Sequence, residues 1–135
     1  MAFFEKAKLE VDIKNRPQKR GDVLQALIRV SPDDKPVTVN YVRVSFEYEG
    51  TWTIPNADGG YIQIEGKARM WAGDLEQSKN VTLQPGQGAM MLPFEWRVPT
   101  DSPLSSQGVK YKLWIRADIP GAKDPEFSTS FDILG

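Results

Sequence analysis

Apolar and polar residues alternate one by one along most of this 135-residue sequence. Successive side chains of a β-strand point to opposite faces of a sheet, so this period of two predicts half-buried strands. The predicted strands cover residues 8–14, 24–30, 42–48, 62–71, 81–83, 92–98, 111–117 and 127–133. The third strand is compatible with a continuation to Trp52, because Gly50 permits a bend or a bulge on the way.

Turn-forming residues separate these segments. The strongest turn is Pro55–Gly60, where Asp-Gly-Gly tolerates positive φ angles. The only segment with weak helical character is the connector Ala72–Lys79. Seven or eight short strands with Gly/Pro turns between them predict an all-β protein, an antiparallel immunoglobulin-like β-sandwich.

Composition narrows the class of protein further. The length suits one domain, which we expect to span residues 1–135. The chain has no Cys and no His, which removes thiolate nucleophiles, Ser-His-Asp catalysis and the usual zinc sites. A net charge of −1 argues against a nucleic-acid partner. Without a signal-peptide pattern or an apolar run of about 18 residues, the sequence predicts a cytoplasmic protein with no integral membrane association.

One block of sequence resembles a known family. Residues 92–99 read LPFEWRVP, followed by Asp101-Ser102-Pro103 and Gly108, a strand at 109–119 and then Lys123-Asp124-Pro125. This block is similar to the strand and loop signature of arrestin-like sandwiches, and the bacterial sporulation-control family resembles it most. The segments 1–6, 16–23 and 42–49 resemble the corresponding parts of that family.

The resemblance covers most of the chain and implies an arrestin-like fold. It also implies a regulatory protein that binds partners and has no catalytic residues to transfer. Typical members carry a second sandwich after the first, whereas this sequence ends at Gly135. Domain rotation is therefore not carried over.

Two of the four tryptophans fall on the polar faces of their strands. Trp71 follows Arg69, and Trp114 lies between Lys112 and Arg116. If both strands belong to one sheet, these five residues form an aromatic and basic patch for a partner peptide or an anionic ligand. The alternative is that each ring lies beneath neighbouring Lys and Arg stems. Trp96 alternates with apolar residues and is predicted to be core.

A second cluster of charge lies in the turn after the first strand. Lys14, Arg16, Lys19 and Arg20 place four positive charges within seven residues. Such a cluster attracts phosphate, acidic peptides or an anionic membrane surface, and it is a candidate anion-binding site. The alternative is a solvated hairpin loop.

Acidic residues near the loops do not predict a metal site. Asp is a preferred turn residue, and the spacing of Asp33, Asp34, Asp58, Asp118 and Asp124 matches no EF-hand. Nothing selects a catalytic pair among the 18 acids. We expect no enzyme activity, no metal and no cofactor.

The edges of the sandwich are further candidates for partner binding. An edge strand exposes unpaired backbone groups that recruit a partner strand or a second copy of the protein. Pro93 and Pro99 indicate that the strand at 92–98 is partly unpaired.

The sequence therefore predicts a non-catalytic interaction module that acts as a regulator or scaffold. Its partners would bind at a strand edge and at the aromatic and basic sheet face. Two alternatives remain open. One is a carbohydrate- or small-ligand-binding sandwich that uses Trp71, Trp114, Tyr61 and Tyr111 as aromatic platforms. The other is a structural subunit of a homo-oligomer.

Overall fold

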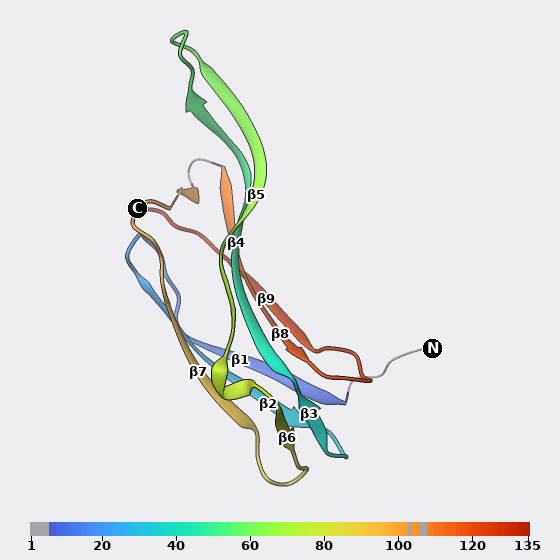
Figure 1. Cartoon of the computed structure of the whole chain (residues 1–135). Helices are drawn as coiled ribbons and strands as arrows, with labels where there is room; N and C mark the ends of the chain where they lie inside the picture. The colour runs from blue at the N-terminus through green and yellow to red at the C-terminus, as the bar shows by residue number, and fades with distance from the viewer. Residues whose placement is uncertain (1–5, 103, 106–107) are drawn as a thin grey trace.

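The computed structural model describes residues 6–102, 104–105 and 108–135, and for residues 52–54, 64 and 67–71 it describes the backbone only. The opening segment 1–5 and part of the loop 99–108, both used in the sequence comparison above, lie outside the described residues. Figure 1 shows strands almost throughout. They are β1 (Ala7–Asn15), β2 (Val23–Pro32), β3 (Val37–Val39), β4 (Tyr41–Pro55), β5 (Tyr61–Asp74), β6 (Val81–Leu83), β7 (Met90–Arg97), β8 (Val109–Asp118) and β9 (Glu126–Phe131), and a 3-10 turn, η1 (Glu76–Ser78), follows β5.

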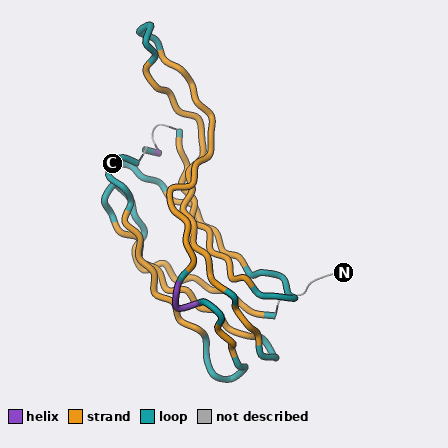
Figure 2. Tube along the Cα trace, in the orientation of Figure 1, coloured by secondary structure: helices purple, strands orange, loops and turns teal. Residues whose placement is uncertain are grey.

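The strands form a sandwich of antiparallel sheets, as the alternating pattern predicts. One sheet has three strands in the order β1-β2-β7, and the other has four in the order β5-β4-β8-β9. A small third sheet, β3-β6, closes one end. Figures 1 and 2 show the two larger sheets as two layers.

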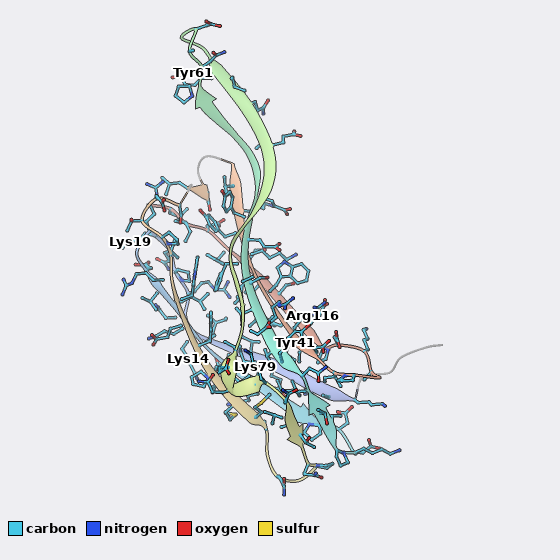
Figure 3. All side chains as sticks on the ribbon, in the orientation of Figure 1. Lys14, Lys19, Tyr41, Tyr61, Lys79 and Arg116 are labelled. Carbon is cyan, nitrogen blue, oxygen red and sulfur yellow. The ribbon has the colours of Figure 1, made fainter. Side chains whose placement is uncertain are left out.

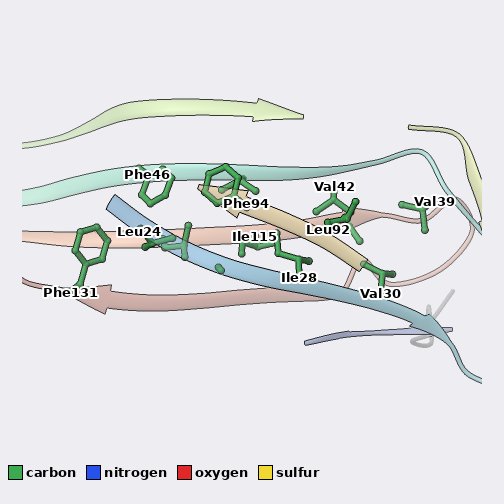
Figure 4. Packing of buried hydrophobic residues seen from close by; sticks show 14 of the residues in the cluster. Leu24, Ile28, Val30, Val39, Val42, Phe46, Leu92, Phe94, Ile115 and Phe131 are labelled. Atoms are coloured by element: carbon green, nitrogen blue, oxygen red, sulfur yellow. The ribbon is translucent and has the colours of Figure 1, made fainter. Parts of the chain in front are cut away.

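The core lies between the layers, where the apolar residues of each alternating strand meet (Figure 4). Phe46 of β4 stacks on Trp96 of β7, with the ring centroids 3.8 Å apart, so Trp96 packs against the core as predicted, although its side chain is only partly buried. On the inner face of β8, Tyr111, Leu113, Ile115 and Ala117 are completely buried. These contacts join segments that lie far apart in the sequence.

The strand at 42–48 continues through Gly50 as far as Pro55, which confirms the predicted continuation. Gly50 has a φ of +153°, and a Cβ built there would lie 2.0 Å from the carbonyl oxygen of Gly108. The glycine is therefore required by a close approach of two backbones. Pairing of β4 with β8 ends at this point, and the β4–β5 hairpin continues beyond the sandwich (Figure 1).

Three features differ from the sequence-based expectation. The short strand β3 was not predicted, because three residues are too few to show a period. The connector 72–79 is not a helix: β5 continues to Asp74, and only one 3-10 turn follows. A β-bulge interrupts the β4–β5 pairing between Phe46 and Glu47.

Among the described residues, no helix is long and apolar enough to cross a membrane.

Candidate functional site

The solvent-facing side of the β5-β4-β8-β9 sheet, here called the outer face, carries a row of small residues around one tryptophan. The register places Ser45 of β4 between Ala72 of β5 and Trp114 of β8, and Trp114 is paired in turn with Ser128 of β9. Small side chains on both sides of a large indole leave space on the sheet surface. The prediction that Lys112, Trp114 and Arg116 lie on the face opposite the core agrees with the burial of their neighbours.

A hollow of about 260 Å³ occupies this space. Ser45 is only 8% exposed and lies at the centre of the small-residue row, whereas Arg43 and Arg116 come from the next row along the strands. The hollow is lined by Arg43, Ser45, Glu47, Trp114, Arg116 and Glu126. Four of these six residues were not singled out from the sequence, although they occupy the polar positions of their strands.

Trp114 has a polar group without a partner. Its indole Nε1 is covered from solvent and makes no hydrogen bond, which makes it the single such side-chain atom in the described part of the chain. A buried donor left without an acceptor costs about 1–3 kcal/mol. The Nζ atom of Lys112 lies 4.3 Å from the centre of the same ring, a cation–π contact on the outer face. The Trp114 ring therefore combines features of both interpretations of the sequence. It lies beneath the Lys112 side chain, as the alternative predicts, and it also lines a hollow on the outer face, as the patch requires.

The two arginines of the hollow are in different states. Arg43 donates to Asp74 through Nε at 2.8 Å, and this hydrogen bond, together with the attraction between the charges, raises the pKa of the Arg43 guanidinium. Arg116 is placed directly opposite Arg43 in the β4–β8 register and opposite Glu126 in the β8–β9 register. Within the described residues, however, Arg116 has neither an ion pair nor a hydrogen bond. Like charges on directly opposite residues destabilise a sheet. Of these two described arginines, Arg43 alone has its charge compensated, by Asp74.

The backbone register separates the positions of Trp71 and Trp114, although their strands belong to one sheet as the patch requires. The bulge at Met70 places Trp71 opposite Phe46 and Arg69 opposite Glu47, whereas Trp114 is opposite Ser45. Trp71 and Trp114 are therefore not in one cross-strand row. The side chains of Trp71 and Arg69 lie outside the described residues, and a role for them in partner binding stays a prediction.

The basic turn is tied to the end of the chain. Arg16 Nη1 donates to the Ser130 carbonyl oxygen at 2.8 Å, and Arg20 Nε donates to the Ser102 carbonyl oxygen at 2.5 Å. Lys14 forms an ion pair with Asp12 and lowers the pKa of that carboxyl group. Figure 3 shows Lys14 and Lys19 well away from Arg116.

Two of the four cations thus hold the turn against other segments, and a third has an acidic neighbour. Among the described residues, the side chain of Lys19 makes neither an ion pair nor a hydrogen bond. Anion binding by this turn stays a prediction that the geometry does little to favour.

The topology decides which strands are edges. β7 is at one edge of the three-stranded sheet, as Pro93 indicated, and β1 is at the other. In the four-stranded sheet the edges are β5 and β9. At β9, Arg16 already occupies the Ser130 carbonyl, so this edge is partly covered by the protein itself.

Of the aromatic residues proposed as a carbohydrate platform, Tyr111 is excluded. It is completely buried in the core, and this burial raises the pKa of its phenol to about 12. Tyr61 is 77% exposed, but it lies near the tip of the projecting hairpin, far from the part of β8 marked by Arg116 in Figure 3. The inclusion of Tyr111 was wrong because its position alternates with the outer face of β8.

Two of the acidic residues near the loops, Asp118 and Asp124, have structural roles. Asp118 Oδ2 accepts a hydrogen bond from Asn40 Nδ2 at 2.8 Å, and Asp124 Oδ1 accepts one from the backbone N–H of Ile119 at 2.9 Å. The described residues contain no group of three or more acidic side chains placed to hold a metal ion.

Comparison with known proteins identifies the family. A family model described as "SpoOM protein" matches residues 4–133. The crystal structure of the sporulation control protein Spo0M from Bacillus subtilis is similar, with a TM-score of 0.74 and 17% identity over 98% of this chain and 51% of that chain. A DUF4466 family protein from Parabacteroides merdae is also similar in fold, with a TM-score of 0.51 and 9% identity over 96% of this chain and 45% of that one.

The chain thus spans about half the length of these two solved structures. At such low identities the two structures show the fold alone. No curated protein matches the sequence.

Proposed function

This chain belongs to the SpoOM protein family, and on that premise we propose that it is a non-catalytic regulatory protein that binds a protein partner through its outer face. The partner contacts Trp114, Lys112 and Arg116 of β8. An exposed strand edge adds backbone hydrogen bonds to the same contact. We place this activity in the cytoplasm.

The observation that carries the proposal is the hollow beside Trp114. Its lining includes Trp114, whose covered indole N–H has no acceptor, and the Arg116 guanidinium, which has no partner among the described residues. Trp and Arg are the residues that most often dominate the binding energy of protein interfaces. A folded protein that leaves both unsatisfied on one surface gains hydrogen bonds when a partner covers that surface.

The edge strand β5 of the same sheet also supports partner binding at the outer face. β5 is an edge strand of this sheet, and beyond Gly50 the β4–β5 hairpin is no longer paired with β8. A two-stranded hairpin alone is only marginally stable in water, so added strand pairing stabilises it. A partner lying across the outer face reaches this edge over β4.

Charge reversal on the outer face tests the proposal. We expect the double variant Lys112→Glu/Arg116→Glu to lose at least about tenfold in affinity for a partner that co-purifies with the wild-type protein. The matched control is Arg29→Glu/Lys35→Glu, which reverses the same number of charges at exposed positions away from the hollow. Quantitative pull-down with purified partner measures both. Equal capture by all three proteins would remove the outer face as the binding surface.

A further inference from the structure

We infer that the hollow beside Trp114 binds a carboxylate side chain, an Asp or Glu of a protein partner. This inference rests on the proposed function and names the chemical group that the outer face recognises.

The charge of the lining selects a single negative charge. Of the two arginines, Arg43 already holds Asp74, so Arg116 is the described lining cation that still lacks a partner. Two carboxylates, Glu47 and Glu126, lie in the same lining. A dianionic phosphate would meet the exposed carboxylate of Glu126, and Arg116 is the one described lining cation left to compensate its charge. A carboxylate carries one charge and matches the planar guanidinium with two parallel hydrogen bonds.

The carboxylate of Glu126 does not fill this role. Glu126 is paired with Arg116 in the β8–β9 register, yet the two side chains form no ion pair. The exposed side chain of Glu126 therefore leaves the guanidinium available to a ligand. The negative charge of Glu126 also makes the approach of a second carboxylate less favourable. The proposal therefore predicts that removing this charge strengthens binding.

Trp114 supplies a second donor. Its Nε1–H has no acceptor and is covered in this structure, so the indole must turn about its side-chain bonds to present the N–H to the hollow. A carboxylate has two oxygens and accepts from the guanidinium and the indole at once. The ammonium group of Lys112, which lies over the same ring, adds attraction at the rim.

The size of the hollow favours one side chain over a larger molecule. Its volume of about 260 Å³ is at or below the lower end of the range for small-molecule sites, about 300–1,000 Å³. The nearly covered Ser45 closes the floor. A single acidic side chain presented by an extended partner segment fits such a shallow space on a sheet.

The test is an NMR titration of the ¹⁵N-labelled protein, with the Trp114 indole signal assigned by its loss in Trp114→Phe. The probes are a capped peptide with Glu at alternate positions, its Gln counterpart and inorganic phosphate. We expect the Glu peptide to shift the indole signal in a saturable manner, while the Gln peptide leaves it in place. Equal shifts from both peptides, no shift from either, or stronger binding of phosphate would overturn the inference.

Variants identify the groups involved. Arg116→Gln is expected to weaken binding of the Glu peptide by about tenfold or more, and Trp114→Phe by about threefold to tenfold, followed by backbone amide shifts. Glu126→Gln is expected to strengthen binding by about two- to fivefold, because it removes a competing charge. The control Arg29→Gln leaves the affinity unchanged. A weaker affinity in Glu126→Gln would contradict the assigned role of the carboxylate.

This outcome is separable from that of the proposed function. If charge reversal abolishes partner capture but the Glu peptide does not shift the Trp114 signal, the outer face binds a partner by other chemistry. If charge reversal leaves capture unchanged, the surface itself is wrong.

Discussion

The two faces of β8 share one backbone and have opposite relations to the rest of the chain. On the inner face, Tyr111, Leu113, Ile115 and Ala117 are completely buried against the other layer. On the outer face, Trp114 leaves its N–H without an acceptor, and Arg116 has no partner among the described residues. Every inner position is satisfied within the protein, whereas the outer positions keep unused hydrogen-bonding capacity.

This difference between the two faces indicates that the inner face of the sheet stabilises the fold and that the outer face is the one suited to recognition. Burial of apolar surface stabilises the fold roughly in proportion to area, so the inner residues contribute most of the free energy of folding. The outer residues contribute little to folding and remain available to a partner. Substitutions on the two faces of the same strand should therefore separate the two properties.

The largest expected effect is on the inner face. Leu113→Ala removes a completely buried side chain that is paired with Phe46 of β4, and it is expected to lower the free energy of unfolding by about 2–5 kcal/mol. Urea denaturation followed by fluorescence measures this loss. At temperatures where the variant remains folded, its partner affinity should equal that of the wild type. A loss below about 1 kcal/mol in the free energy of unfolding would contradict the comparison, because burial on the inner face would then contribute little to stability.

High pH probes the same face through Tyr111. Burial raises the pKa of its phenol to about 12, from 10.0 for the unperturbed group. Between these pH values the unfolded chain releases this proton and the folded chain keeps it. The free energy of unfolding therefore falls as the pH rises, by about 2–3 kcal/mol in all, at about 1.4 kcal/mol per pKa unit.

Urea titrations between about pH 9 and about pH 12 test this, with Tyr111→Phe as the control. The variant lacks the phenol, so its stability should fall less steeply over that interval. Parallel curves for the two proteins would show that the phenol ionises as readily in the folded state as in the unfolded chain.

On the outer face, removing a polar group should not destabilise the protein. Trp114→Phe deletes the covered N–H and keeps an aromatic ring, so we expect the free energy of unfolding to stay constant or to rise by up to about 1 kcal/mol. Thermal denaturation is a sufficient measurement. A decrease of more than about 1 kcal/mol would mean that Trp114 belongs energetically to the core.

The smallest effect is expected at Lys112. Its ammonium group lies over the Trp114 ring at a half-buried position, and Lys112→Ala should lower the free energy of unfolding by about 0.5–1 kcal/mol. Repeating the measurement in the Trp114→Leu background removes the ring and should remove this difference. A persistent effect in that background would assign it to packing of the Lys stem instead.

Sequence reasoning located most strands and both faces of β8, because alternation is a local property of the chain. Its failures have specific physical causes. The bulge at Met70 shifts the register by one residue, so alternation along β5 is no longer a guide to which residues share a row with Trp114. Arg43, Ser45, Glu47 and Glu126 escaped notice for another reason, since polar residues on a solvent-facing side carry no local signal of being neighbours.

Pro93 shows the opposite case, in which one residue predicted a tertiary property. Proline cannot donate a hydrogen bond to a neighbouring strand, and β7 is indeed an edge strand.

The basic turn shows the limit of counting charges. Four cations close in sequence predict an anion site, which stays a prediction, and the count gave no sign that Arg16 and Arg20 donate to carbonyl groups of Ser130 and Ser102, more than 80 residues away.

By itself, the sequence determined the fold class, the inward set of residues and the polar set that faces solvent, since a period of two follows directly from strand geometry. Only the tertiary structure decided which polar residues meet. Strand order and register place Ser45 beside Trp114 and Arg43 beside Arg116, although about 70 residues separate the members of each pair. This pairing forms the hollow beside Trp114 and places in its lining the Arg116 guanidinium, which has no partner among the described residues. Hydrogen bonds between distant strands are not encoded in any local pattern of the chain.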